Sequence, residues 1–121
     1  MVVDAVKNFE VGDGFGKSTT HGPLIHGNAV TKVQEHVEDA VAQGAKILLG
    51  GKRLGEAGTN YFPVTVLSNM KPGMRLCREE TFSPVAAFFP FTTEEEAIEL
   101  ASDTDMGLAG YFFSKDVNRC W

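Results

Sequence analysis

Cysteine is scarce in this chain of 121 residues, which contains only Cys77 and Cys120. The two thiols are far apart and form no Cys-x-x-Cys pair, so the sequence predicts no disulfide framework. Disulfides are typical of oxidising compartments, and the first residues match neither a signal peptide nor an arginine-rich transit peptide. We therefore expect an intracellular protein, cytoplasmic or mitochondrial, and not a secreted one.

Positive charge and long apolar runs are also scarce. The chain has 11 Lys and Arg residues against 16 Asp and Glu residues, which gives a formal net charge of −5. Binding to a nucleic-acid backbone needs a basic stripe, so these counts argue against a nucleic-acid partner. No apolar run approaches the roughly 20 residues of a membrane-spanning helix, so we expect no membrane partner either.

Metal-binding patterns are absent. His21 and His26 lie in a glycine-containing loop, while His36 lies within a predicted helix. No cysteine or carboxylate stands at zinc-ligand spacing from them. We therefore expect no metal site and place all three histidines on the surface.

The glycine-rich run Gly12-Asp13-Gly14-Phe15-Gly16-Lys17-Ser18 resembles a phosphate-binding loop only in composition. A Walker A motif needs four residues between its outer glycines, and Gly12 and Gly16 enclose three. Lys17 stands where a GxGxxG pattern needs its third glycine. We interpret the run as an ordinary glycine turn.

The strongest periodic signal begins at Ala29, where apolar residues recur at helical spacing and charged residues fall on the other side. The apolar positions are Val30, Val33, Val37, Ala40 and Val41. We expect a helix that is capped by Asn28, ends near Gly44 and buries its four valines.

Four segments after this helix have the composition of strands. They are Lys46–Leu49, Tyr61–Leu67, Val85–Phe91 and Leu108–Phe113. Pro63 limits the second to a sheet edge or to the start of a strand, and Thr93 with Glu96 predicts a capping box for a short helix. A helix followed by an uninterrupted apolar strand is typical of α/β proteins. The sequence therefore predicts a partial parallel sheet flanked by helices, with Ile47, Leu48 and Leu49 in the sheet.

Both ends of the sequence fall within predicted helices. Residues 2–9 have the pattern of the last two turns of a helix, and Ser114 is placed to cap a helix that has barely begun at Trp121. We therefore expect an internal segment of a larger domain.

The most informative stretch is Arg78-Glu79-Glu80-Thr81-Phe82-Ser83-Pro84, which places two carboxylates before an aromatic ring and a turn. Adjacent residues of an extended segment point to opposite faces, so only one glutamate can contact a given ligand. Phe82 shares the face of Glu80. A carboxylate can accept hydrogen bonds from both hydroxyls of a ribose. Spacing alone still favours a solvated acidic turn, and it leaves Phe82 open to core packing or to a place in a pocket wall.

Cys77 lies between Arg75 and Arg78, whose charges would favour its thiolate form. No histidine is close in sequence to act as a base for it. We interpret Cys77 as a half-buried structural residue, and Cys120 carries no signal.

The stretch from Arg78 to Pro84 closely resembles the Glu-Glu-Thr/Ile-Phe-Gly-Pro signature of the aldehyde dehydrogenase superfamily. Other segments resemble the same family, namely Gly22–Ile25, Gly44–Gly51, Tyr61–Leu67 and Asp105–Ser114. Within the family, Lys17–Thr20 and Leu108–Ser114 are most similar to the succinate-semialdehyde dehydrogenases. Ser83 stands where the family usually has glycine, and serine fits an extended residue before proline, so we expect the turn to be kept with slightly altered geometry.

The resemblance implies that residues 1–121 are a partial aldehyde dehydrogenase catalytic domain. The complete enzyme would then oxidise an aldehyde, here succinate semialdehyde, to the acid with NAD or NADP as hydride acceptor, and it would be a homo-oligomer. The resemblance assigns Glu80 to the nicotinamide ribose of the cofactor and Phe82 to a place beside it. It gives no residue of this chain a catalytic role, because the family's cysteine nucleophile lies upstream of the signature.

Two other functions remain open from the sequence. The chain alone, without the nucleophile, is expected to be inactive. One alternative is a non-catalytic fragment that docks onto full-length subunits, and a weaker alternative is a stand-alone small-ligand-binding module.

Overall fold

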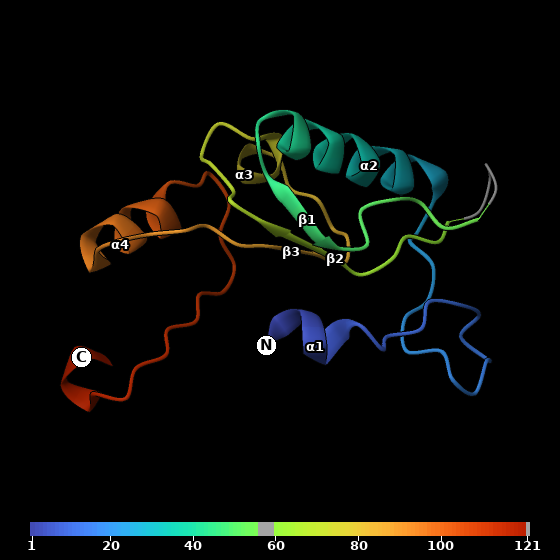
Figure 1. Cartoon of the computed structure of the whole chain (residues 1–121), viewed down its shortest axis with the longest axis horizontal. Coiled ribbons are helices and arrows are strands. Elements are labelled where there is room, and N and C mark those ends of the chain that lie inside the picture. Colours follow the sequence, from blue (N-terminus) through green and yellow to red (C-terminus); the bar gives the residue numbers. More distant parts are fainter. Residues whose placement is uncertain (56–59, 121) are drawn as a thin grey trace.

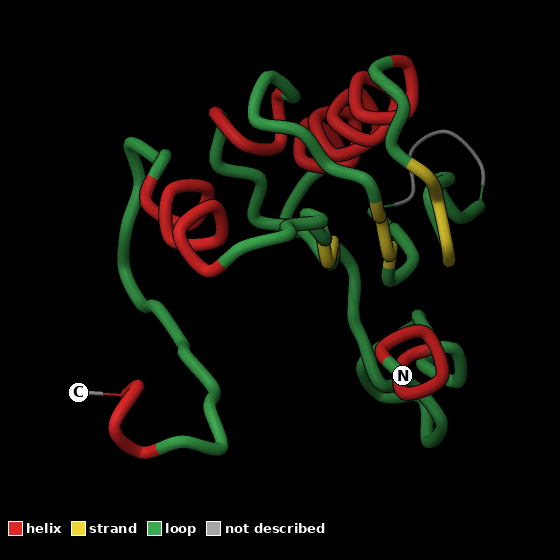
Figure 2. Tube along the Cα trace, turned by 60° about the vertical axis from the view of Figure 1, so that its left-hand side comes forward, coloured by secondary structure: helices red, strands yellow, loops and turns green. Residues whose placement is uncertain are grey.

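The computed structural model describes residues 1–55 and 60–120, and Figure 1 shows a small sheet with helices on both sides. The helices are α1 (Val2–Val6), α2 (Gly27–Ala42), α3 (Arg75–Arg78), α4 (Glu94–Ser102) and a short 3-10 helix, η1 (Val117–Cys120). The strands are β1 (Lys46–Leu49), β2 (Thr65–Ser68) and β3 (Val85–Ala87). Helices α2 and α1 lie on opposite sides of the sheet in both views (Figures 1 and 2). The predicted α/β fold class is confirmed.

The sheet is mixed rather than wholly parallel, which corrects the predicted topology. Its strand order is β1-β2-β3. Strand β2 pairs in parallel with β3, with Thr65 opposite Val85, but it pairs antiparallel with β1, with Lys46 opposite Ser68. Parallel neighbours need a crossover connection, which α3 supplies between β2 and β3. Antiparallel neighbours need no such crossover, and the described residues 50–55 and 60–64 between β1 and β2 contain no helix.

Helix α2 packs its apolar stripe against the sheet, as predicted for three of its four valines. Val30 and Val33 are fully buried and Val37 is 1% exposed, whereas Val41 is 43% exposed, which corrects the prediction for that residue. Ala40 is buried in its place. The buried positions of the stripe are three or four residues apart. Near the end of the helix, the buried position is Ala40 rather than Val41.

The ends of the helices follow the predicted chemistry only in part. His26, not Asn28, caps α2, because its Nδ1 accepts a hydrogen bond from the Ala29 amide at 3.0 Å. Gly44 follows the helix with φ +100°, a conformation that suits glycine, as predicted. Thr93 caps α4 by accepting from the Glu96 amide at 3.2 Å. The Glu96 carboxylate completes no capping box, since it accepts from the Thr92 amide instead.

Of the two later strands predicted from composition, one is shorter than predicted and the other does not form. Strand β3 covers only the first three residues of the predicted segment 85–91, and residues 108–113 form no strand. The chain after α4 extends away from the sheet in both views (Figures 1 and 2), so no neighbouring strand pairs with it. Residues Ile47, Leu48 and Leu49 do lie in β1, but the first two are exposed because β1 is an edge strand.

In the described residues, none of the helices has the length and apolar character needed to cross a bilayer.

The two valines of α2 that differ in burial provide a matched test of the core. Val37→Ala should lower the free energy of unfolding by about 1.5–3 kcal/mol, because it removes buried methyl groups and leaves a cavity. Val41→Ala should change it by less than about 0.5 kcal/mol, as expected at an exposed site. Urea denaturation followed by circular dichroism measures both values. Equal losses for the two variants would contradict the observed packing of α2.

Candidate functional site

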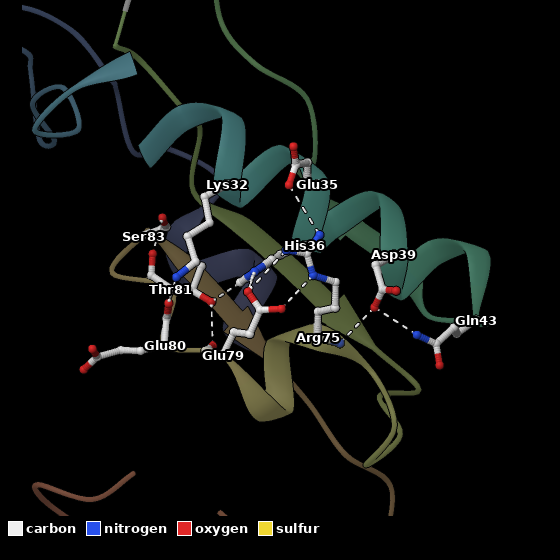
Figure 3. A network of polar contacts seen from close by, with 10 residues as sticks. All are labelled: Lys32, Glu35, His36, Asp39, Gln43, Arg75, Glu79, Glu80, Thr81 and Ser83. Carbon is white, nitrogen blue, oxygen red and sulfur yellow. Dashed lines mark hydrogen bonds and ion pairs between the residues drawn. The ribbon is translucent and has the colours of Figure 1, made fainter. Parts of the chain in front are cut away.

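The candidate site is the turn between α3 and β3, residues 79–84, which we call the signature turn. Glu79 follows α3 with extended backbone angles (φ −119°, ψ 133°). Extended backbone sends successive side chains to opposite sides. Figure 3 shows Glu79 pointing toward Arg75 and His36, while Glu80 points away from them.

Glu79 is an anchor within the protein. Its carboxylate accepts hydrogen bonds from Arg75 Nε at 2.8 Å and Arg75 Nη2 at 3.2 Å, and it lies 3.0 Å from Nε2 of His36. The Arg75 guanidinium, and then His36, lower the pKa of Glu79 to about 2. The carboxylate of Glu79 is therefore ionised at neutral pH and engaged by its neighbours.

His36 is fully buried, which corrects the prediction that it lies on the surface. Its Nδ1 lies 2.8 Å from the hydroxyl oxygen of Thr81, and its Nε2 contacts Glu79. The partners are 45 and 43 residues away in sequence, so spacing could not reveal them. The burial of His36 could have been predicted only from its position in the helix. It lies three residues after Val33, on the buried face.

Glu80 is exposed, and its carboxylate accepts no hydrogen bond within residues 1–55 and 60–120. Only its backbone carbonyl is engaged, by Lys32 Nζ at 2.6 Å. Glu80 and Phe82 together line two cavities. One, of about 390 Å³, extends toward Cys77, and the other, of about 600 Å³, extends toward Lys32 and the start of α2. The structure thus brings the two predicted site residues together.

Phe82 has the most unusual backbone of the turn. Its φ is +39°, in the left-handed region that non-glycine residues rarely adopt, and its ring is 85% exposed. Core packing within this chain, one of the two interpretations left open for Phe82, is therefore wrong. The left-handed residue is Phe82 and not Ser83, so Ser83 needs none of the conformational freedom of glycine. The Ser83 hydroxyl donates to the Thr81 carbonyl at 2.8 Å and holds the turn.

Cys77 is half-buried, as predicted, and its environment opposes the thiolate form. Burial raises the pKa of its thiol, although the charge of Arg78 acts in the other direction. The thiol donates to the Lys71 carbonyl at 3.1 Å, and Arg78 is itself paired with Asp103 at 2.6 and 2.9 Å. The half-burial of Cys77 is confirmed, and these contacts favour its interpretation as a structural residue.

The other candidate motifs behave as loop elements. In the run from Gly12 to Ser18, the Asp13 carbonyl accepts from the Gly16 amide at 2.9 Å, so the run is a turn as interpreted. The next helix, α2, begins only at Gly27.

Among the residues that the structure describes, no three His, Cys, Asp or Glu side chains lie close enough to hold a metal ion.

The fold and the site together define a class of protein. A carboxylate and an aromatic ring stand exposed beside two cavities, next to the sheet of an α/β protein. A network of Arg75, Glu79 and the buried His36 holds the adjoining residue of the turn. This arrangement is typical of a ligand-binding segment.

Comparison with known sequences identifies the family. The profile of the "Aldehyde dehydrogenase family" matches residues 1–121. Succinate-semialdehyde dehydrogenase NADP(+) 1 of Schizosaccharomyces pombe is 48% identical over 119 residues, which cover 98% of this chain and 24% of that protein. The mitochondrial succinate-semialdehyde dehydrogenase of Rattus norvegicus is 50% identical over 115 residues, which cover 95% of this chain and 22% of that protein. The chain belongs to the aldehyde dehydrogenase family.

Solved structures agree with this assignment. Succinate-semialdehyde dehydrogenase from Burkholderia pseudomallei superposes with a TM-score of 0.92 at 46% identity, over 99% of this chain and 25% of that one. Betaine aldehyde dehydrogenase from Staphylococcus aureus, in complex with NAD+, gives a TM-score of 0.85 at 40% identity, over 98% of this chain and 24% of that one. The family resemblance seen in the sequence is confirmed, and the chain spans about a quarter of the length of these relatives.

The depressed pKa of Glu79 predicts how its contribution to stability depends on pH. Folding lowers this pKa from 4.5 to about 2, so the stabilisation is complete above pH 4.5 and is lost as the pH falls toward 2. The stability difference between the parent protein and Glu79→Gln should be constant between about pH 7 and 5.5 and should shrink below about pH 4.5. The effect should be small, because the side chain is 40% exposed and water screens the ion pair.

Urea denaturation of both proteins across this pH range measures the difference. Glu38→Gln, at an exposed glutamate of α2 outside the network, is the matched control. A difference that grows on acidification would show that Glu79 is not stabilised as a carboxylate.

Proposed function

We propose that residues 1–121 form part of the catalytic domain of an NAD(P)-dependent aldehyde dehydrogenase. We further propose that the complete enzyme oxidises succinate semialdehyde to the corresponding acid, since relatives with that name match 95–98% of this chain. The observation that carries the proposal is the exposed carboxylate of Glu80 beside the ring of Phe82 at the edge of two cavities.

The residues present fit the nicotinamide end of the cofactor. The carboxylate of Glu80 has both oxygens available in the described part of the chain, and it can accept hydrogen bonds from the two hydroxyls of a ribose. Phe82 offers a flat, exposed apolar surface next to it. When bound, NAD or NADP supplies the acceptor for the hydride that leaves the aldehyde carbon.

Both forms of the cofactor are compatible with this segment. One relative carries NADP(+) in its name, and the Staphylococcus aureus structure is a complex with NAD+. The two cofactors differ at the 2′ position of the adenosine ribose, which the proposed contact of Glu80 with the nicotinamide ribose does not involve.

The nucleophile must come from outside this chain. Burial raises the pKa of Cys77, whereas a catalytic cysteine needs a lowered one. No histidine contacts Cys77 or Cys120 among the contacts of the described residues. We infer that the chain contributes one wall of the cofactor site and does not oxidise aldehydes by itself.

The second candidate function is a non-catalytic fragment that docks onto full-length subunits. Large apolar side chains on and after α4 are exposed, among them Ile98, Leu108, Tyr111 and Phe113. Exposed apolar patches promote association. The same surface suits the remainder of an aldehyde dehydrogenase subunit and a homo-oligomer of the parent enzyme. We place that enzyme in the cytoplasm or the mitochondrion, since the name of the rat relative specifies mitochondria.

The role of Glu80 can be tested in a full-length enzyme that carries residues 1–121. Glu80→Gln should slow hydride transfer by the equivalent of about 1–3 kcal/mol, the range for loss of a hydrogen bond to a charged group. The overall affinity for the cofactor should change less, because only the nicotinamide end loses a contact. Single-turnover formation of NAD(P)H measures the first quantity and titration of the cofactor the second.

Glu79→Gln and Glu38→Gln are the matched variants for this experiment, one in the network and one outside it. If Glu80→Gln has no effect while Glu79→Gln slows hydride transfer, the two roles are reversed and the assignment of Glu80 is wrong.

The purified chain of 121 residues should form no NADH or NADPH from succinate semialdehyde or simple aldehydes, because it has no activated nucleophile. Absorbance at the nicotinamide band measures product formation directly. Turnover above background that disappears in Cys77→Ser would contradict both the inactivity and the structural role of Cys77.

A further inference from the structure

We infer that His36 is a positioning residue that directs the carboxylate of Glu80 toward the cofactor, an inference that rests on the proposed function. The argument starts from the contacts between α2 and the signature turn. His36 bonds to Glu79 through Nε2 at 3.0 Å and to Thr81 through Nδ1 at 2.8 Å, so one buried ring holds both neighbours of Glu80. Figure 3 shows His36 between these two side chains, with Glu80 directed away.

A third contact fixes the backbone of Glu80 itself. Lys32 lies one helical turn before His36 on α2, and its Nζ donates to the carbonyl of Glu80 at 2.6 Å. Three consecutive residues of the turn are therefore held by one helix, the outer two by side-chain contacts and the middle one by its backbone.

These contacts determine the side of the backbone from which the side chain of Glu80 extends. In extended backbone, side chains that flank a residue point to the face opposite to its own. Because Glu79 and Thr81 are both held toward His36, the side chain of Glu80 is directed away from His36, and it lines both cavities. To turn Glu80 inward, the protein would have to break the bonds of His36 to both neighbours.

The two ring nitrogens of His36 have different hydrogen-bonding roles in these contacts. An ionised carboxylate only accepts hydrogen bonds, so Nε2 of His36 donates to Glu79, and Nδ1 is left for the Thr81 hydroxyl. The ring is wholly buried, so the packed side chains around it restrict its motion.

Loss of His36 should loosen the turn without unfolding it. Arg75 would still hold Glu79 through Nε and Nη2, and the core residues Val33 and Val37 would remain packed beside the substituted position. This separation makes the role testable, since a positioning defect should appear in hydride transfer rather than in stability alone.

Four variants of the full-length enzyme that carries residues 1–121 separate the possibilities. His36→Leu removes both contacts, His36→Gln can keep the one to Glu79, and His36→Asn can keep the one to Thr81. His21→Leu is the control, because this histidine lies in the N-terminal loop against Phe9 and outside the network. Melting temperature and circular dichroism report whether each variant folds.

The rate of hydride transfer in His36→Leu should fall by about 10-fold to 100-fold, comparable with the loss of a residue that orients a metal ligand. KM for the cofactor should change by less than about threefold, since the contacts that bind the rest of the cofactor are untouched. His36→Gln and His36→Asn should each recover part of the rate. If His36→Leu fails to fold, these two variants and Thr81→Val carry the test.

The decisive measurement combines His36→Leu, or the folded variant that replaces it, with Glu80→Gln. If His36 acts through Glu80, the double variant should transfer hydride no more slowly than Glu80→Gln alone. If Glu80→Gln alone has no effect, the proposed function fails. If Glu80→Gln slows the reaction but the His36 variants match the parent, or if the two losses multiply, the positioning role of His36 is overturned while the proposed function stands.

Discussion

The contact between the buried imidazole of His36 and the carboxylate of Glu79 is the interaction on which the arrangement of this segment depends. It joins the longest helix, α2, to the turn that leads into β3. Arg75 reinforces it, since its guanidinium contacts both Glu79 and Glu35 of α2. The network uses one of two adjacent glutamates as an internal anchor, which leaves the other available for a ligand. The two neighbouring glutamates thus have different contacts, because their side chains face opposite sides of the chain.

The packing of α2 provides the rigid support that this network needs. Val30, Val33 and Val37 are buried against residues of the sheet side, including Leu67 and Phe62. Because protein cores are close-packed, the helix cannot shift without disturbing the sheet, and the positions of Lys32 and His36 are fixed with it. A second pair, Arg78 with Asp103, fixes the end of α3 to the residue that follows α4. The signature turn, which lines the two cavities, is therefore supported by α2, and the preceding helix α3 is supported by the pair of Arg78 and Asp103.

Periodicity and composition predicted α2, the α/β class and the position of β1, because these depend on residues close in sequence. They failed where the outcome depends on distant residues. The burial of His36 depends on Glu79 and Thr81, and the direction of β1 depends on how the chain returns to β2. Strand composition at 108–113 produced no strand because no neighbour pairs with it. The signature stretch identified the family from its residues, and the resemblance already favoured Glu80 over Glu79 as the cofactor ligand. The contacts of Glu79 with Arg75 and His36 could not be predicted, because His36 lies 43 residues away in sequence.

The most direct test of the account is a crystal structure of a full-length enzyme that carries residues 1–121, bound to NAD+ or NADP+. The account predicts that the carboxylate of Glu80 lies within hydrogen-bonding distance of the nicotinamide ribose hydroxyls, with Phe82 beside the ring and His36 still bonded to Glu79. A complex in which Glu79 has left His36 to contact the ribose, while Glu80 points into solvent, would contradict it.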